Sequence, residues 1–128
     1  MRESATASHI TLYAAYAGAL LWRNNVGVAI TDNGRHVRYG LCNETAKMNK
    51  EIKSSDWIGI TPVLITPEMV GKTVGLFTAI ETKPSDWKLN TACDRTLAQG
   101  KFHDIVRQAG GFAGFARDVE EFKRITGL

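Results

Sequence analysis

The sequence predicts a mixed α/β protein of one domain, in which helices cover both sides of a mixed β-sheet. The length of 128 residues suits a single domain. Apolar residues recur at helical spacing in three segments, and the stretches between them hold the β-branched and aromatic residues typical of strands. Taken in chain order, these patterns predict a helix, four strands, a helix, a strand and a helix, which is an order that places helices on both faces of a sheet.

The first helix is expected over residues 3–20, with Ser4 or Thr6 as its N-cap. Its apolar side would consist of Ile10, Tyr13, Ala14, Ala17, Leu20 and Leu21. An irregular strand should follow in LLWRNNVGVAIT, because the paired asparagines interrupt its apolar residues. The turn signal Asp32-Asn33-Gly34 then predicts a hairpin whose return strand runs to Leu41.

Residues 42–55 are polar and rich in lysine, and we expect a mobile loop there with a short helical turn. Two apolar stretches come next, DWIGITPVLIT and VGLFTAIETK. We expect a strand in each. The second is almost continuously apolar, which predicts a strand buried on both faces at the centre of the sheet.

The last third of the chain predicts a helix, a strand and a helix. Residues 91–109 have an apolar side suited to a helix that ends at the Gly110-Gly111 pair. FAGFA is expected to be a short strand. Asp118 should cap the final helix, because acidic residues also occupy its first turn.

Composition narrows the range of functions. The net charge of +3 and pI of about 9.0 are compatible with a polyanionic partner. Cys42 and Cys93 lack the spacing of a zinc site or a disulfide scaffold. No signal-peptide pattern is present, and the longest apolar stretch, residues 13–22, is too short to span a bilayer. We therefore expect a cytoplasmic protein with no membrane partner.

Chemistry is suggested by a repeated tripeptide and a charged pair. Ser-Asp-Trp occurs at Asp56, before an apolar stretch, and at Asp86, in a sequence typical of a turn. Glu81 and Lys83 lie two apart at the end of a predicted strand, so their side chains share a face. If the Asp56 strand pairs beside them, two carboxylates and an ammonium converge, which is a grouping that suits Mg²⁺ and phosphate. The same Glu-x-Lys spacing also occurs on solvated strands.

The order of motifs along the chain resembles a known family. The motifs are WRNNVG, RYGL, KSSDWIGITP, FTAIETK, Gln99 and FHDIVRQAGGFAGFA. Together they are similar to VRR-NUC (virus-type replication-repair nuclease) domains of the PD-(D/E)xK superfamily, especially small phage-type members. The resemblance implies a restriction-endonuclease-like core and a Mg²⁺- or Mn²⁺-dependent DNA endonuclease. It also implies selectivity for branched or junction DNA, a homodimer, and the cytoplasm of a bacterium or phage-infected cell.

The resemblance also implies roles for individual residues. Asp56 and Glu81 correspond to the metal-binding carboxylates, with the Thr82 carbonyl as a further ligand, and Lys83 to the catalytic lysine. Glu3 matches an acidic residue beside the metal, and Gln99 matches a glutamine near the catalytic site. Two positions depart from the pattern: Ser55 stands where the superfamily has proline, and Trp57 where an aliphatic residue is usual.

A set of polar and basic residues near these motifs is expected to contact the DNA backbone. The set is Arg23, Asn24, Asn25, Arg38, Lys53 and Ser55. The alternative function is a non-catalytic DNA-binding or interaction protein that retains the nuclease fold. The presence of Asp56, Glu81 and Lys83 together disfavours this alternative, because converging carboxylates repel each other without a metal.

Overall fold

The computed structural model describes residues 2–128 and divides into two compact units. The first unit is Met1–Gly59 and the second is Ile60–Leu128. Within the described residues both helices and strands are present in each unit, so the predicted α/β class is confirmed. Each unit is described by itself.

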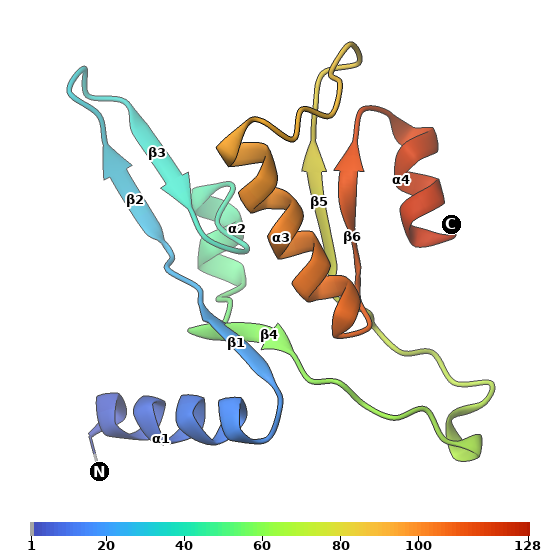
Figure 1. The fold of residues 1–128 in the computed structure, drawn as a ribbon. Helices are drawn as coiled ribbons and strands as arrows, with labels where there is room; N and C mark the ends of the chain where they lie inside the picture. Colours follow the sequence, from blue (N-terminus) through green and yellow to red (C-terminus); the bar gives the residue numbers. More distant parts are fainter. Residues whose placement is uncertain (1) are drawn as a thin grey trace. The chain divides into compact units, whose positions relative to one another are not determined.

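The first unit begins with a helix and contains a β-hairpin (Figure 1). Its elements are α1 (Glu3–Tyr16), β1 (Leu20–Arg23), β2 (Gly27–Ile30), β3 (His36–Tyr39), α2 (Ala46–Glu51) and β4 (Trp57–Ile60), whose last residue starts the second unit. Strands β2 and β3 pair antiparallel, with Gly27 opposite Tyr39 and Ile30 opposite His36. The predicted hairpin is therefore confirmed, and Gly34 provides the positive φ of +80° in its turn.

Helix α1 differs from its prediction in length, cap and burial. It ends at Tyr16 rather than residue 20, and Arg2 is the N-cap without a side-chain bond. The prediction of Ser4 or Thr6 as the cap was wrong, because both residues already lie inside the first turns. Ile10 and Tyr13 are exposed, and Ala14 is the buried residue of the helix.

The lysine-rich segment contains more regular structure than predicted. Helix α2 (Ala46–Glu51) occupies its middle. Thr45 caps this helix, since its hydroxyl accepts a hydrogen bond from the Met48 amide at 3.0 Å. The segment expected to be a mobile loop is thus a capped helix with short flanks.

Asn43 is a buried residue whose side chain bonds to both strands of the hairpin in the first unit. Only 2% of this residue is exposed. Its Nδ2 donates to the carbonyl oxygens of Gly27 and Tyr39, both at 2.8 Å. Gly27 and Tyr39 are paired residues of β2 and β3, so one amide side chain bonds to both strands at the same register position.

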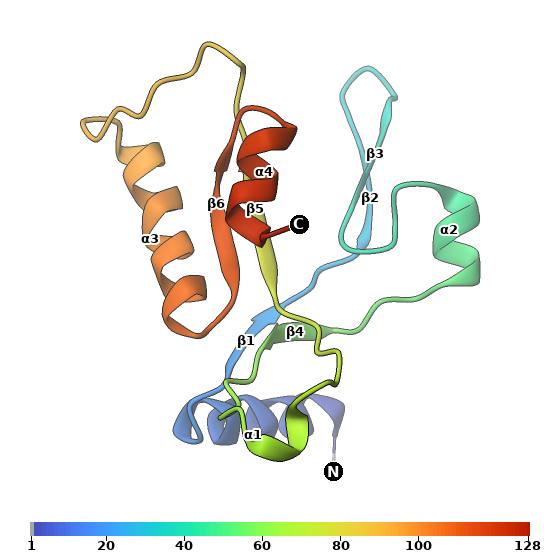
Figure 2. The ribbon, with the colours of Figure 1, turned by 90° about the vertical axis from the view of Figure 1, so that its right-hand side faces the viewer.

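The second unit is a parallel pair of strands with a helix on each face (Figures 1 and 2). Its elements are η1 (Pro67–Met69), β5 (Thr78–Thr82), α3 (Asp94–Gln108), β6 (Phe112–Ala116) and α4 (Val119–Thr126). Successive side chains of β6 point to opposite faces. Phe115 contacts His103 of α3, whereas a Cβ at Gly114 would meet Ile125 of α4 at 2.9 Å. Helices α3 and α4 therefore cover opposite faces of the pair.

Two strand predictions need correction. DWIGITPVLIT forms a strand only over β4, and Val63, Leu64 and Ile65 are irregular and exposed. Proline at position 62 explains the end of the strand, because it has no N–H to donate to a ladder. Strand β5 is half-buried rather than buried on both faces. Strand β5 pairs with β6, and β4 pairs with β1, so the condition that the Asp56 strand pairs beside the Glu81 strand is not met.

The apolar interior of the second unit is small. Its most buried side chains are Val106, Ala113 and Ala116, together with the polar Thr96 and His103. The final helix follows its prediction: the Asp118 carboxylate accepts from the Glu121 amide at 2.8 Å. Within residues 2–128, no helix combines the length and apolar character needed to cross a bilayer.

Candidate functional site

The predicted site residues fall into two groups, one in each unit. The first unit contains Glu3, Arg23, Asn24, Asn25, Arg38, Lys53, Ser55 and Asp56. The second contains Glu81, Thr82, Lys83 and Gln99. The structure brings several members of each group together, and each pocket that they line lies within a single unit.

In the second unit, Lys83 directly follows the last residue of β5, and hydrogen bonds hold both its backbone and its side chain. Its amide donates to the Ala116 carbonyl at 2.9 Å, which extends the β5–β6 pairing past Thr82. Its ammonium donates to Gln99 Oε1 at 3.0 Å and lies 3.8 Å from the Glu81 carboxylate. The side chain of Lys83 is 14% exposed. The ammonium is therefore held by two side chains from different elements.

Glu81 and Gln99 also line a pocket of about 370 Å³. The other residues that line it are Arg95, Ala98, Phe102 and His103. Arg95, Gln99 and His103 are spaced by four along α3, so they share one face of the helix. Neither Arg95 nor His103 was predicted, although their spacing from Gln99 was a signal that could have identified them.

His103 is almost fully buried. Burial is the main cause that lowers its pKa below 6.5, and the charge of Arg107 lowers the pKa further. The imidazole is therefore neutral at neutral pH. A neutral ring packs against Phe115 in a T-shaped arrangement, with 4.7 Å between the ring centroids, and does not add a second cation beside Lys83.

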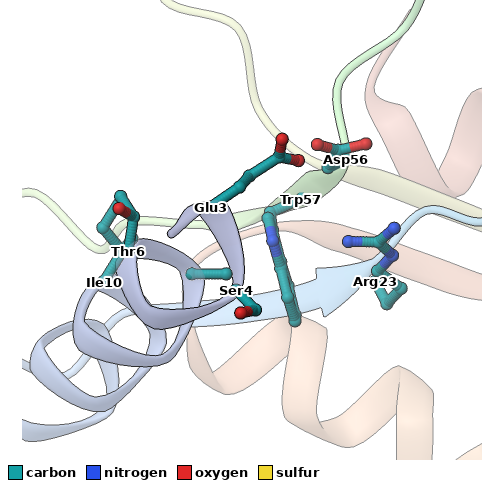
Figure 3. A pocket seen from close by; sticks show the side chains of 8 residues that line it. Glu3, Ser4, Thr6, Ile10, Arg23, Asp56 and Trp57 are labelled. Carbon is teal, nitrogen blue, oxygen red and sulfur yellow. The ribbon is translucent and has the colours of Figure 1, made fainter. Parts of the chain in front are cut away.

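In the first unit, Glu3 and Asp56 line the same pocket of about 420 Å³. Figure 3 shows their carboxylate groups side by side, with Arg23 on the other side of Asp56. The guanidinium of Arg23 lies 5.5 Å from the centre of the Trp57 ring, within the range of a cation–π contact. Glu3 and Asp56 therefore lie beside each other at this pocket.

A second pocket of the first unit is predominantly polar and has a volume of about 340 Å³. Five of the predicted DNA-binding residues line it: Arg23, Asn24, Asn25, Lys53 and Ser55. The Lys53 ammonium donates to Asn49 at 2.6 Å and Arg23 donates to Asn25 at 3.3 Å. These amides and cations form a concave surface of the kind that accepts a phosphate group.

Asn24 and Arg38 have internal partners. Asn24 is buried, and its Nδ2 donates at 2.8 Å to both the Ser54 hydroxyl and the Ser55 carbonyl. Its backbone amide donates to the Asp56 carbonyl. The Arg38 guanidinium donates to the carbonyl and side-chain oxygens of Asn43 at 3.0 and 2.9 Å. The structure therefore gives both residues a supporting role.

The donors present suit a hard divalent cation. Mg²⁺ is usually bound by one or two carboxylates and keeps several waters, and Glu3 and Asp56 provide two carboxylates at one pocket. Over residues 2–128, no group of three or more His, Cys, Asp or Glu side chains could hold a metal ion.

Three residues near the predicted ones were not expected to belong to the candidate site: Arg95, Ser54 and Trp87. Ser54 accepts from Asn24 and donates to the Leu41 carbonyl at 2.8 Å. Such bonds join distant segments and leave no local sequence pattern.

In comparisons with known proteins, no family model, no curated protein and no solved structure matches this chain.

Proposed function

We propose that this protein is a metal-dependent endonuclease that hydrolyses phosphodiester bonds of DNA. The observation that supports this most is the position of Lys83, whose ammonium is fixed by Gln99 at 3.0 Å and Glu81 at 3.8 Å. A lysine on a mobile surface strand would have no such partners. An oriented cation beside a carboxylate suits a reaction in which negative charge grows on a phosphate.

The chemistry divides among the chain's own residues. Water attacks the phosphorus and forms a new P–O bond while the bond to the leaving oxygen breaks. The attacking water gives one proton to solvent, and the leaving oxygen takes one proton from solvent. Lys83 donates a hydrogen bond to the phosphate oxygen on which charge accumulates. The proposed metal-binding groups are Glu3 and Asp56 in the first unit, and Glu81 with the Thr82 carbonyl in the second. A bound Mg²⁺ or Mn²⁺ lowers the pKa of its water and polarises the phosphate.

The DNA backbone is the proposed occupant of the polar pocket of the first unit. Its cations, Arg23 and Lys53, and its amide and hydroxyl groups can contact phosphate without reading the base sequence. Selectivity for branched or junction DNA and a homodimeric state form part of the proposal, on the strength of the sequence resemblance.

Cleavage of labelled four-way junction and linear duplex DNA tests the proposal. Wild type and Lys88→Ala should cut with Mg²⁺ or Mn²⁺, whereas Lys83→Ala and Glu81→Ala should not. Lys88 is an exposed lysine in the same segment and controls for a general loss of positive charge. Faster cleavage of the junction than of the duplex would support branch selectivity, and equal rates would contradict it.

Thermal melting in Mn²⁺ tests metal binding without relying on activity. An ion that binds the folded state raises the melting temperature. Asp56→Ala and Glu81→Ala should each reduce this rise, and Glu3→Gln should reduce it less. Glu44→Gln, an exposed carboxylate, is the control and should melt as wild type does. No rise in the wild-type protein would contradict metal binding.

The alternative is a DNA-binding protein without catalysis. The polar pocket of the first unit favours it, because its residues could hold a phosphate without any chemistry. Junction binding by wild type with no cleavage in either metal would support this alternative. Light scattering decides the oligomeric state, and a monomer would contradict the homodimer.

A further inference from the structure

The ammonium of Lys83 lies over two aromatic rings. Its Nζ is 5.5 Å from the centre of the Trp87 ring and 5.5 Å from that of Phe115. The two rings are 4.9 Å apart and inclined by 35°. Both distances are within the range of about 6 Å at which a ring attracts a cation. We call this pair of rings the aromatic platform.

The platform complements the polar partners of Lys83. An ammonium has three donor hydrogens, of which one is directed to Gln99. Glu81 attracts the charge from 3.8 Å. The rings take no hydrogen bond of ordinary strength, so they restrain the position of the ammonium and still allow it to donate to another acceptor. A phosphate oxygen is such an acceptor.

The two rings are held in place by separate parts of the second unit. Phe115 lies opposite Glu81 in the parallel register of β5 and β6, and its ring also packs against His103 in a T-shaped arrangement. Trp87 follows a turn in which its amide donates to the Pro84 carbonyl at 2.9 Å. The Trp87 carbonyl in turn accepts from Arg117 at 3.2 Å. Each ring of the platform is therefore anchored by contacts of its own.

We propose that Trp87 and Phe115 are positioning residues that fix the Lys83 ammonium for the reaction. This inference rests on the proposed nuclease function. Without the Trp87 ring, the ammonium can occupy other rotamers, and the fraction of molecules with a correctly placed cation falls. The loss should affect kcat, because the rings contact the ammonium of Lys83, which is proposed to act on the phosphate during the reaction. A cation–π contact of ordinary strength corresponds to a decrease of roughly tenfold.

Kinetics on a cleavable DNA substrate provide the first test. Trp87→Leu should lower kcat roughly tenfold with KM little changed. Trp87→Phe keeps a ring and should recover most of the rate. Leu89→Ala, at an exposed apolar residue two positions further on, is the control for disturbance of the segment and should behave as wild type does. Equal kcat in Trp87→Leu and wild type would overturn the proposal.

Nuclear magnetic resonance of ¹³Cε-labelled lysine tests the platform without using activity. Ring currents should move the Lys83 ε-methylene signal upfield of that of exposed Lys88. Trp87→Leu should remove most of this shift, and Trp87→Phe part of it. An unshifted Lys83 signal in wild type overturns the platform itself. A shifted signal in a wild-type protein that cuts no DNA retains the platform and overturns its role in the reaction.

Discussion

The backbone amide of Asn24 donates to the carbonyl oxygen of Asp56 at 2.8 Å. The side chain of Asn24 adds bonds to Ser54 and Ser55, so one buried residue fixes the segment that ends in the proposed metal-binding carboxylate. We expect Asn24→Ala to destabilise the protein by about 1–3 kcal/mol, since buried polar partners lose their bonds. It should also weaken the Mn²⁺-induced rise in melting temperature.

The neighbouring Asn25→Ala variant is the control for Asn24. Asn25 is exposed, and its side chain has a single bond to Arg23 at 3.3 Å. The Asn25→Ala substitution should leave the free energy of unfolding, measured in urea, nearly unchanged. If both variants unfold at the same urea concentration, Asn24 has no special role in holding the Asp56 segment.

Asn43→Ala tests whether the Asn43 side chain stabilises the hairpin of the first unit. Removal of the amide leaves the Gly27 and Tyr39 carbonyls without its two bonds and deprives Arg38 of an acceptor. We expect a loss of about 2–4 kcal/mol in the free energy of unfolding. Asn49→Ala, which removes an exposed bond to Lys53, should cost less than about 1 kcal/mol. Circular dichroism during urea unfolding would measure both.

Gln99→Leu removes the hydrogen-bond acceptor of Lys83 with little change in size. A hydrogen bond to a charged group contributes about 1.5–3 kcal/mol, so kcat should fall at least roughly tenfold. Gln99→Glu retains an acceptor and should lose less. Gln108→Leu, at the exposed end of α3, is the control. An unchanged kcat in Gln99→Leu would exclude Gln99 from the positioning of Lys83.

Glu121 makes the stability of the second unit depend on pH. Its pKa is below the usual 4.5, first because the Arg117 side chain donates to it and then because the Arg117 amide does. An acid with a lowered pKa in the folded state adds stability that is complete above pH 4.5 and is lost as the pH falls below it.

The Glu121→Gln variant should therefore melt below wild type at about pH 6, and the difference should shrink at about pH 3.5. Glu120→Gln is the matched control, because Glu120 is an exposed partner of Lys123 at 3.3 Å. It should change the melting temperature little at either pH. A difference for Glu121→Gln that stays constant across this range would show that the carboxylate charge is not the cause.

Features that depend on near neighbours in the chain could be predicted from the sequence. The hairpin follows from Asp32-Asn33-Gly34, and the start of α4 follows from Asp118. The proximity of Glu81 and Lys83 follows from the two-residue period of a strand. In each case the signal and the structure it determines lie within a few residues.

Features that join distant segments could not be predicted in this way. The partners of Asn24 are 30 and 31 residues away, and the Gly27 partner of Asn43 is 16 residues away. The platform under Lys83 depends on the parallel register that brings Phe115 opposite Glu81. The burial expected for Ile10 was also wrong, since Ile10 is exposed and Ala14 is the buried residue of α1.

The two Ser-Asp-Trp segments share one arrangement: a cation lies 5.5 Å from the Trp57 ring in one unit and 5.5 Å from the Trp87 ring in the other. Indole fluorescence responds to charges at this distance. The chain has three tryptophans, so replacing Trp22 and one of these two with phenylalanine leaves a single emitter in a chosen unit. Each unit thus contains a tryptophan beside a cation, and DNA whose phosphates neutralise the charge of Arg23 or Lys83 should change the emission without any added dye.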